Sequence, residues 1–230
     1  MPSTHATTPF AASRATPQRR ESDEERLTRL RRLAETSPER SEREGWAWLQ
    51  ELCAPAAHYR LPWLFAQGTA PESPDGDCEG IVMNLHGSSW LVGLDRLVRL
   101  GQWLGGIGWT GKSFSATAGT GYNRLTKSSR IAATIALPRY AFRTQGDELI
   151  GFPFYHALES SPVAPHGMVR SITYDAPEHG NPLVLPRTRD ELVEIVPGVY
   201  LGRALLRGRH GWDVVGYFGL RAPRATGAAT

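Results

Sequence analysis

Four ionisable residues lie inside apolar stretches of the sequence and are the candidates for acid–base chemistry: His86, Lys112, Tyr174 and Asp175. A histidine buried in an apolar segment can act as a general base near neutral pH. A lysine on a glycine-rich strand can stabilise an enolate or a carboxylate. Tyr174 and Asp175 form a polar pair within an otherwise apolar segment. We take these four residues as the predicted catalytic set.

Each of the four also has a purely structural interpretation, and the sequence leaves both open. Neighbouring residues on a strand face opposite ways, so if Tyr174 points into a core, Asp175 points out. Asp175 is followed by Ala-Pro, which is typical of a residue that caps a turn. His86 can be a hydrogen-bonded core side chain, and Lys112 can reach solvent.

Several function classes lack their sequence signatures. There is no Gly-x-Ser-x-Gly, no His-x-His or His-Glu-x-x-His, no Walker loop and no strand-to-helix Gly-x-Gly-x-x-Gly. We therefore expect no metal and no cofactor. The net charge is +3, and the basic residues, all arginines except Lys112 and Lys127, are spread along the chain. A nucleic-acid partner is not expected, because such proteins carry a one-sided basic stripe.

The compartment is inferred from the cysteines and from the hydropathy pattern. Cys53 and Cys78 have no metal-ligand spacing and no disulfide framework. No apolar run approaches the roughly 18 residues of a membrane span, so no membrane partner is expected. Residues 2–20 have the composition of a transit peptide but no amphipathic period, which favours a disordered tail. We expect a cytoplasmic protein.

The chain divides into four parts: a disordered tail over residues 1–20, a helical segment and linker over 21–76, a β-barrel domain over 77–222, and a second tail over 223–230. In the helical segment Ser22 and Glu25 form a capping box, which predicts a helix start. A second helix is expected from about Pro38, or from a further capping box at Ser41 and Glu44, and it ends at Pro55. Residues 54–79, which contain several prolines and a Pro-Asp-Gly-Asp turn, are expected to be irregular. Two amphipathic helices bury little alone, so they pack either on the later domain or on a second subunit of a homodimer.

The barrel domain reads as short strands separated by turns, which argues for an antiparallel barrel or sandwich. One helix is expected inside it, over residues 90–104, and a short helical turn over 189–195. Glycines surround Trp109, which either plugs one end of the barrel or contacts a ligand. Alternation places Trp109 and Lys112 on opposite faces of their strand. The predicted strands cover 80–86, 107–115, 119–126, 130–144, 148–158, 167–175, 182–188, 197–207 and 211–222.

Two groups of short motifs resemble the GXWXG-domain family together with its usual C-terminal partner domain of unknown function. The motifs are Trp109–Phe114 with Gly121–Leu125, and Ile172–Asp175 with Asn181-Pro182, Asp190–Gly202 and Tyr217–Arg221. The resemblance covers roughly residues 80–222. It implies a small calycin-like or lipocalin-like antiparallel β-barrel, and it brings no settled activity.

The interior of an eight-stranded barrel either fills with side chains or holds one small apolar ligand. Aromatic and long apolar residues on the strands are the predicted substrate-binding set: Trp109, Tyr122, Tyr140, Phe142, Phe154, Met168 and Tyr217. We expect a cofactor-independent cyclase or isomerase of secondary metabolism that acts on a large apolar, polyketide- or terpenoid-like metabolite.

Three other functions fit the same barrel. One is a carrier that binds an apolar small molecule without chemistry. Another is a haem-binding barrel that uses one axial histidine, for which the candidates are His86, His156 and His166. The last is a filled barrel that serves as an oligomerisation module.

Overall fold

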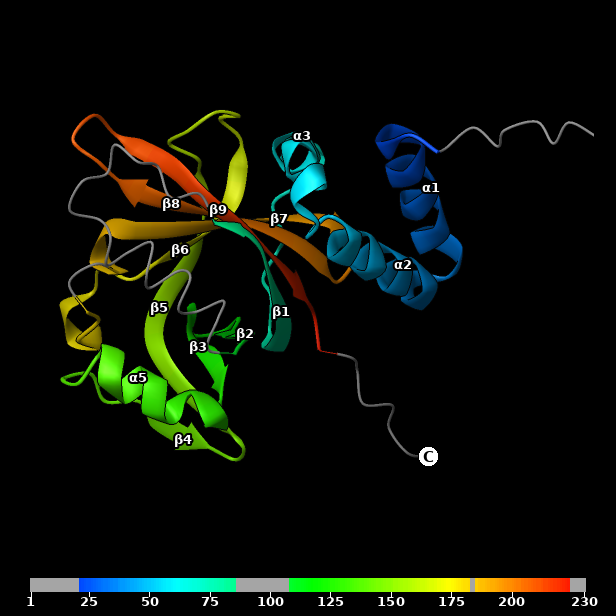
Figure 1. The fold of residues 1–230 in the computed structure, drawn as a ribbon. Coiled ribbons are helices and arrows are strands. Elements are labelled where there is room, and N and C mark those ends of the chain that lie inside the picture. The colour runs from blue at the N-terminus through cyan, green and yellow to red at the C-terminus, as the bar shows by residue number, and fades with distance from the viewer. Residues whose placement is uncertain (1–20, 86–107, 183–184, 224–230) are drawn as a thin grey trace, which may run out of the picture.

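The computed structural model describes residues 21–85, 108–182 and 185–223, and it is a closed, calycin-like antiparallel β-barrel with helices outside it (Figure 1). Eight strands form the barrel in the order β1-β2-β3-β5-β6-β7-β8-β9, and β9 pairs back onto β1. These strands are β1 Gly76–Leu85, β2 Trp109–Ser115, β3 Thr120–Thr126, β5 Glu148–Ser160, β6 Met168–Thr173, β7 Thr188–Val196, β8 Val199–Arg207 and β9 Trp212–Arg221. A short strand, β4 (Arg143–Gln145), pairs with β5 beside the barrel. The predicted fold class is confirmed.

Two N-terminal helices form where the sequence predicts them. α1 (Asp23–Thr36) begins at Ser22, whose side chain and that of Glu25 make both hydrogen bonds of the predicted capping box. α2 (Pro38–Glu51) follows after Ser37. None of the described helices combines the length and apolarity needed to cross a membrane.

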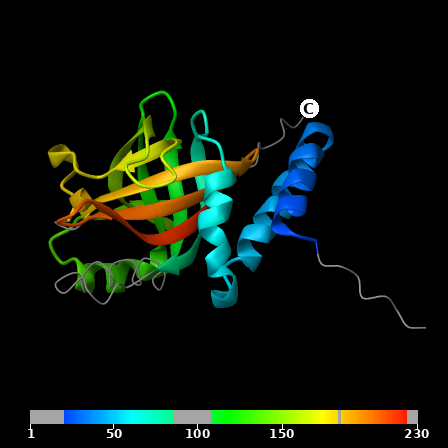
Figure 2. The ribbon, with the colours of Figure 1, turned by 90° about the horizontal axis from the view of Figure 1, so that it is seen from above.

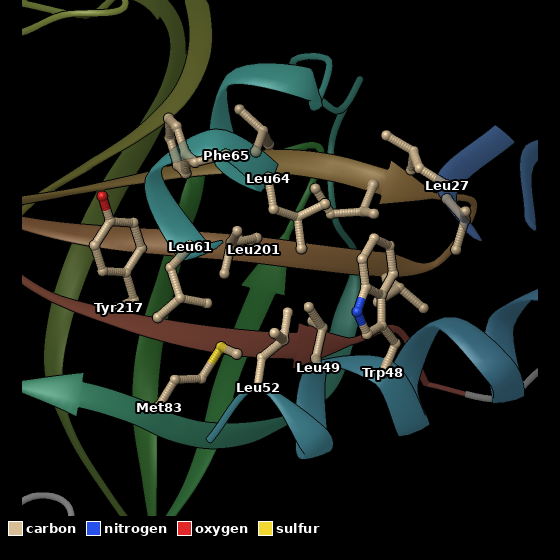
Figure 3. Close-up of a cluster of buried hydrophobic side chains, with 14 of the residues drawn as sticks. Leu27, Trp48, Leu49, Leu52, Leu61, Leu64, Phe65, Met83, Leu201 and Tyr217 are labelled. Carbon is tan, nitrogen blue, oxygen red and sulfur yellow. The ribbon is translucent and has the colours of Figure 1, made fainter. Parts of the chain in front are cut away.

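The helices α1, α2 and α3 (Leu61–Gln67) lie on one side of the barrel, as Figures 1 and 2 show. A 3-10 helix (Pro55–Arg60) joins α2 to α3. Their apolar side chains meet those of β1, β7, β8 and β9 in an outer core on the barrel wall (Figure 3). Its members include Trp48, Leu49, Leu61, Leu64, Phe65, Met83, Leu201 and Tyr217. Of the two expected partners for these helices, the structure shows the barrel.

A second apolar core lies in the barrel interior. It contains side chains from β1, β2, β5 to β9 and the segments after β6, among them Phe114, Phe152, Phe154, Ile172, Tyr174, Leu192, Tyr200 and Phe218. Consecutive residues belong to different cores, as in Tyr217 (outer) and Phe218 (inner). The strand alternation thus sorts each residue to the wall or to the interior.

Three predictions of local structure are wrong. Residues 130–144 do not form one strand, because alanine-rich Arg130–Ala136 is the helix α5, which ends before Pro138, and only Arg143–Gln145 is extended. Residues 189–195 form strand β7 instead of a helical turn, because they pair on both sides with β6 and β8. The segment between α2 and β1, predicted to be irregular, contains α3.

Two further predictions concern segments that the structure describes only in part or not at all. In the predicted strand 182–188, Leu185–Arg187 form a 3-10 turn instead, and residues 183 and 184 lie outside the described residues. The helix predicted over 90–104 and the candidate His86 lie outside them as well.

A β-bulge corrects the expected facing of Trp109. The β2–β3 register shifts between Trp109 and Gly111, and Gly111 has φ of +139°. A Cβ at Gly111 would lie 2.0 Å from the carbonyl oxygen of Cys78, so only glycine fits there. Because the bulge adds one residue, Trp109 faces the interior together with Lys112 rather than opposite to it.

Candidate active site inside the barrel

The side chain of Lys112 lies inside the barrel and is only 3% exposed. It comes from β2, and all three of its hydrogen-bonding positions have partners. The Nζ atom lies 2.9 Å from Asn123 Oδ1, 2.6 Å from the Tyr174 hydroxyl oxygen and 2.9 Å from Asp190 Oδ2. An ammonium has three donors, so this arrangement uses the full capacity of the group.

Tyr174 and Asp190 reach the lysine from β6 and β7. The Tyr174 hydroxyl donates to Asp190 Oδ2 at 2.7 Å and accepts from Lys112. Tyr174 directly follows β6, where its carbonyl oxygen accepts a hydrogen bond from Asn181 Nδ2 at 3.1 Å. Asp190 pairs with Ile172 across the β6–β7 ladder, which places its side chain on the inward face. The three side chains form one closed hydrogen-bonded triangle.

Asn123, on β3, fixes the position of the ammonium. Its Oδ1 atom accepts from Lys112 and from Trp109 Nε1 at 3.1 Å, and its Nδ2 atom donates to the Phe152 carbonyl oxygen at 3.2 Å. Phe152 has φ of +51°, a left-handed backbone conformation that is costly for a bulky residue. Its amide donates to the Tyr140 hydroxyl at 2.5 Å, so the strained residue is held by hydrogen bonds on both sides.

Aromatic rings surround the ammonium. Nζ of Lys112 lies 5.3 to 5.8 Å from the ring centroids of four residues: Trp109, Phe154, Tyr174 and Phe218. Such rings attract a cation and keep water away from it. Gly202 makes room for one of them, since a Cβ there would lie 2.3 Å from the Phe218 ring. The polar cluster therefore sits in an apolar, aromatic enclosure.

Burial shifts the proton affinities of the cluster. It lowers the pKa of Lys112, because the charged form loses its hydration, and the negative charge of Asp190 opposes this shift. Burial and the same negative charge raise the pKa of Tyr174 well above its usual value of 10. Tyr174 thus stays a phenol near neutral pH. The site offers a neutral hydroxyl donor beside an ammonium and a carboxylate, which are the components of acid–base catalysis.

The structure brings together some of the predicted site residues. Lys112, Tyr174, Trp109 and Phe154 meet in this cluster, and Tyr140 and Phe142 pack around Phe152 at its edge. The others lie elsewhere. Asp175 is exposed, Tyr122 donates to Gln145 on the outside, Met168 is 50% exposed and Tyr217 packs against Phe65 in the outer core.

Two residues of the cluster, Asp190 and Asn123, are absent from the predicted set. Asp190 supplies a carboxylate in place of the predicted Asp175, whereas the sequence pattern predicts a helical turn over residues 189–195. As a strand, the same residues alternate, with Asp190 and Leu192 on one face and Glu191 on the other. Asn123 alternates with Tyr122 and Arg124 in the same way. The sequence signal that could have identified both residues is the alternation of inward-facing and outward-facing side chains along each strand.

The histidines proposed as haem ligands occupy different environments. His156 is a barrel-interior residue, and His166 is exposed, with Nδ1 located 3.2 Å from the Ser161 carbonyl oxygen. Within the described part of the chain, no three His, Cys, Asp or Glu side chains gather in a way that could hold a metal ion.

No family model matches this chain, and no curated protein matches it. Among solved structures, it is similar to a protein from Thermomonospora curvata known by its crystal structure. The two chains are 15% identical, and the match covers 70% of this chain and 83% of the other, with a TM-score of 0.39. A similarity this distant says nothing about activity.

Proposed function

We propose that this protein is a cofactor-independent isomerase or cyclase that acts on an apolar small molecule inside the barrel. The observation that carries the proposal is the triangle of Lys112, Tyr174 and Asp190, in which a buried ammonium, a phenol and a carboxylate share hydrogen bonds of 2.6 to 2.9 Å. Buried ion pairs are a weak source of stability compared with an apolar core of the same volume. For stability alone, an apolar core of the same volume serves as well.

Each group has a role in the proposed reaction. A substrate oxygen replaces Asp190 as acceptor of the Tyr174 hydroxyl, and this hydrogen bond stabilises the negative charge that develops on that oxygen. Asp190, still paired with Lys112, takes a proton from a substrate carbon. The same proton returns to a different atom of the substrate. Reactant and product then have the same composition, which defines an isomerisation or an intramolecular cyclisation.

The aromatic enclosure indicates the class of substrate. Rings of Trp109, Phe154 and Phe218 offer apolar surface and contribute no further hydrogen-bond acceptors of their own. Such a surface suits a ring-rich or branched metabolite of polyketide or terpenoid type. Its exclusion of water strengthens every electrostatic interaction at the reacting atoms.

The test compares metabolites in a deletion strain that is complemented with three versions of the gene. We expect the deletion strain to accumulate an isomer of the normal product, with identical mass and a different ring system. The wild type restores the product, whereas Tyr174→Phe lowers the turnover of the purified enzyme by about 10²- to 10³-fold, the usual effect of removing one donor to a developing negative oxygen.

Tyr155→Phe is the matched control. The Tyr155 hydroxyl also donates to a carboxylate, that of Glu178, at 3.0 Å, but the residue is exposed. This variant restores the product fully. Full restoration by Tyr174→Phe as well would contradict the proposal.

A second candidate is a non-catalytic carrier, and one observation favours it. The three donors of Lys112 already have partners within the protein, so the cluster is complete without a ligand. For a carrier, the deletion strain makes the unchanged product at lower titre. Ligand affinity then also survives Tyr174→Phe.

A further inference from the structure

A second group of polar atoms lies inside the barrel, toward the end where β2 meets β3. His156, on β5, is only 6% exposed, and its ring packs edge-on against Phe114 and Phe154 at centroid distances of 5.3 and 6.4 Å. Its Nε2 atom lies 3.3 Å from the carbonyl oxygen of Ser115, so Nε2 carries the proton of the neutral ring. The Nδ1 atom is buried and has no partner at normal hydrogen-bond geometry among the described residues, although the Thr120 backbone lies close enough to raise the pKa of the ring.

Arg170 approaches the same region from β6. It is two residues from Ile172 and four from Tyr174, so all three face the barrel interior. Its Nη2 atom donates to the Pro71 carbonyl oxygen at 3.1 Å, while its Nε atom is buried without a partner. No carboxylate of the described residues forms an ion pair with it. A half-buried guanidinium without a counter-ion is costly, and natural structures usually supply one.

The linker before β1 crosses over these two residues. Pro71 accepts the hydrogen bond from Arg170, and the Asp75 carboxylate accepts one from the Ala116 amide in the β2–β3 turn at 2.8 Å. Ser73 lies between these two anchors, and its Oγ atom is likewise buried with no partner among the described residues. His156 and Arg170 are diagonal neighbours on the inner face of the β5–β6 ladder, since His156 pairs with Ile172 and Leu158 pairs with Arg170. Each thus presents one buried polar atom without a partner, and the two form a cluster that a polar ligand group can satisfy.

We propose that this cluster binds the carboxyl group of the substrate. One carboxyl oxygen shares a proton with His156 Nδ1, and the other accepts from Arg170 Nε. A carboxylate fits if one proton is taken up from solvent on binding: that proton is held between one carboxylate oxygen and the acceptor nitrogen Nδ1, and the other oxygen accepts from the guanidinium. The inference deepens the proposed function and rests on it, because it specifies the substrate as an apolar carboxylic acid.

Phe154 connects this subsite to the proposed reaction centre. Its ring packs against His156 on one side and against Tyr174 at a centroid distance of 5.8 Å on the other. A molecule whose carboxyl end lies at His156 and Arg170 extends its apolar body along Phe114 and Phe154. The reacting atoms then lie at the Tyr174 hydroxyl.

The test uses a fluorescent acid, cis-parinaric acid, and its uncharged methyl ester as probes of the purified full-length protein. The wild type is expected to bind the acid about tenfold or more tightly than the ester, the usual effect of hydrogen bonds to a charged group. Arg170→Met removes this preference, because binding of the acid weakens to about the level of the ester. His156→Gln weakens it, which supplies a second variant if Arg170→Met fails to fold.

Arg187→Met is the matched control, since Arg187 also donates to a backbone carbonyl oxygen, that of Arg207, but is exposed. It should keep the full preference for the acid. Equal affinity of the wild type for acid and ester would overturn the carboxyl subsite and leave the proposed function at Lys112, Tyr174 and Asp190 intact. Binding of neither probe would overturn both. Displacement of the acid by acetate as efficiently as by a long-chain acid would reduce the site to one for small free anions.

Discussion

Two consecutive residues of β7, Asp190 and Glu191, belong to two different buried charge networks. Asp190 faces the barrel interior and joins Lys112 and Tyr174. Glu191 faces the wall, is 0% exposed, and accepts hydrogen bonds from Arg203, Arg189 and Ser161. The networks thus lie on opposite sides of one strand, and both contain a buried ion pair.

The wall network is tied to backbone. Arg203 donates to the carbonyl oxygens of Ala164 and Val163 at 2.9 and 3.3 Å, and its guanidinium lies 4.2 Å from the ring centroid of Phe65 in α3. Arg189 donates to the Ser160 carbonyl oxygen in addition. These contacts fasten the loop between β5 and β6 and the helix α3 to the barrel. The network's task is structural.

The interior network is tied almost wholly to other side chains. Lys112, Tyr174 and Asp190 bond to each other and to Asn123. Among the described residues, the one backbone contact of these side-chain groups is that of the Asn123 amide with the Phe152 carbonyl. None of the described loops depends on these groups for its attachment to the barrel. Two equally buried ion pairs thus differ in their partners. Backbone groups surround the pair that supports the structure, and other side chains surround the pair for which we propose chemistry.

The largest effect on stability is expected from Glu191→Gln. The change leaves the buried guanidinium of Arg203 without its counter-charge, which costs about 3–5 kcal/mol in the free energy of unfolding. Urea unfolding followed by circular dichroism measures it. Glu159→Gln is the control, because the Glu159 side chain is 45% exposed and its pair with Arg189 is expected to contribute at most about 1 kcal/mol. An equal decrease in the free energy of unfolding of the two variants would contradict the prediction that the buried wall network stabilises the fold more than an exposed ion pair does.

Replacing both charges of a pair sharpens the comparison. In the interior, Lys112→Met combined with Asp190→Leu in a Tyr174→Phe background, which leaves no buried hydroxyl without a partner, is expected to leave the free energy of unfolding unchanged or to raise it by about 1–4 kcal/mol, since apolar groups replace a desolvated pair. Turnover is lost in the same variant. On the wall, Arg203→Met combined with Glu191→Leu remains destabilising, because the carbonyl groups of Val163 and Ala164 lose their donor. Loss of stability in the interior double variant would assign that network to structure.

The fold was largely predictable because its signals are local. The capping box at Ser22 and the strand-and-turn pattern after Asp77 led to the two helices and the barrel. The errors arose where pairing overrides propensity. Residues 189–195 contain leucine and glutamate, which favour helix, but they extend because β6 and β8 pair with them on both sides.

The site was only partly predictable, for two physical reasons. Lys112 and Tyr174 stand out because each is a polar group within an apolar stretch. Asp190 and Asn123 do not, since their inward facing depends on strand register. Register in turn depends on bulges such as the one at Gly111, which moved Trp109 to the inner face. Asp175 has the right chemistry, but as the neighbour of inward-facing Tyr174 it is exposed.

The smallest expected effect concerns His156, which belongs to the barrel interior yet bonds to backbone like the wall residues. Burial lowers its pKa below the usual 6.5. As the pH falls through about 6.5, the unfolded chain binds a proton that the folded protein does not, so the free energy of unfolding falls until the folded pKa is reached. Above about pH 6.5 this contribution is complete.

The wild type should therefore lose more stability between about pH 7 and 5 than His156→Gln does in urea unfolding. His166→Gln, which changes an exposed histidine, should keep the wild-type pH dependence. Identical slopes for the wild type and His156→Gln would show that the barrel accepts a protonated His156 without cost.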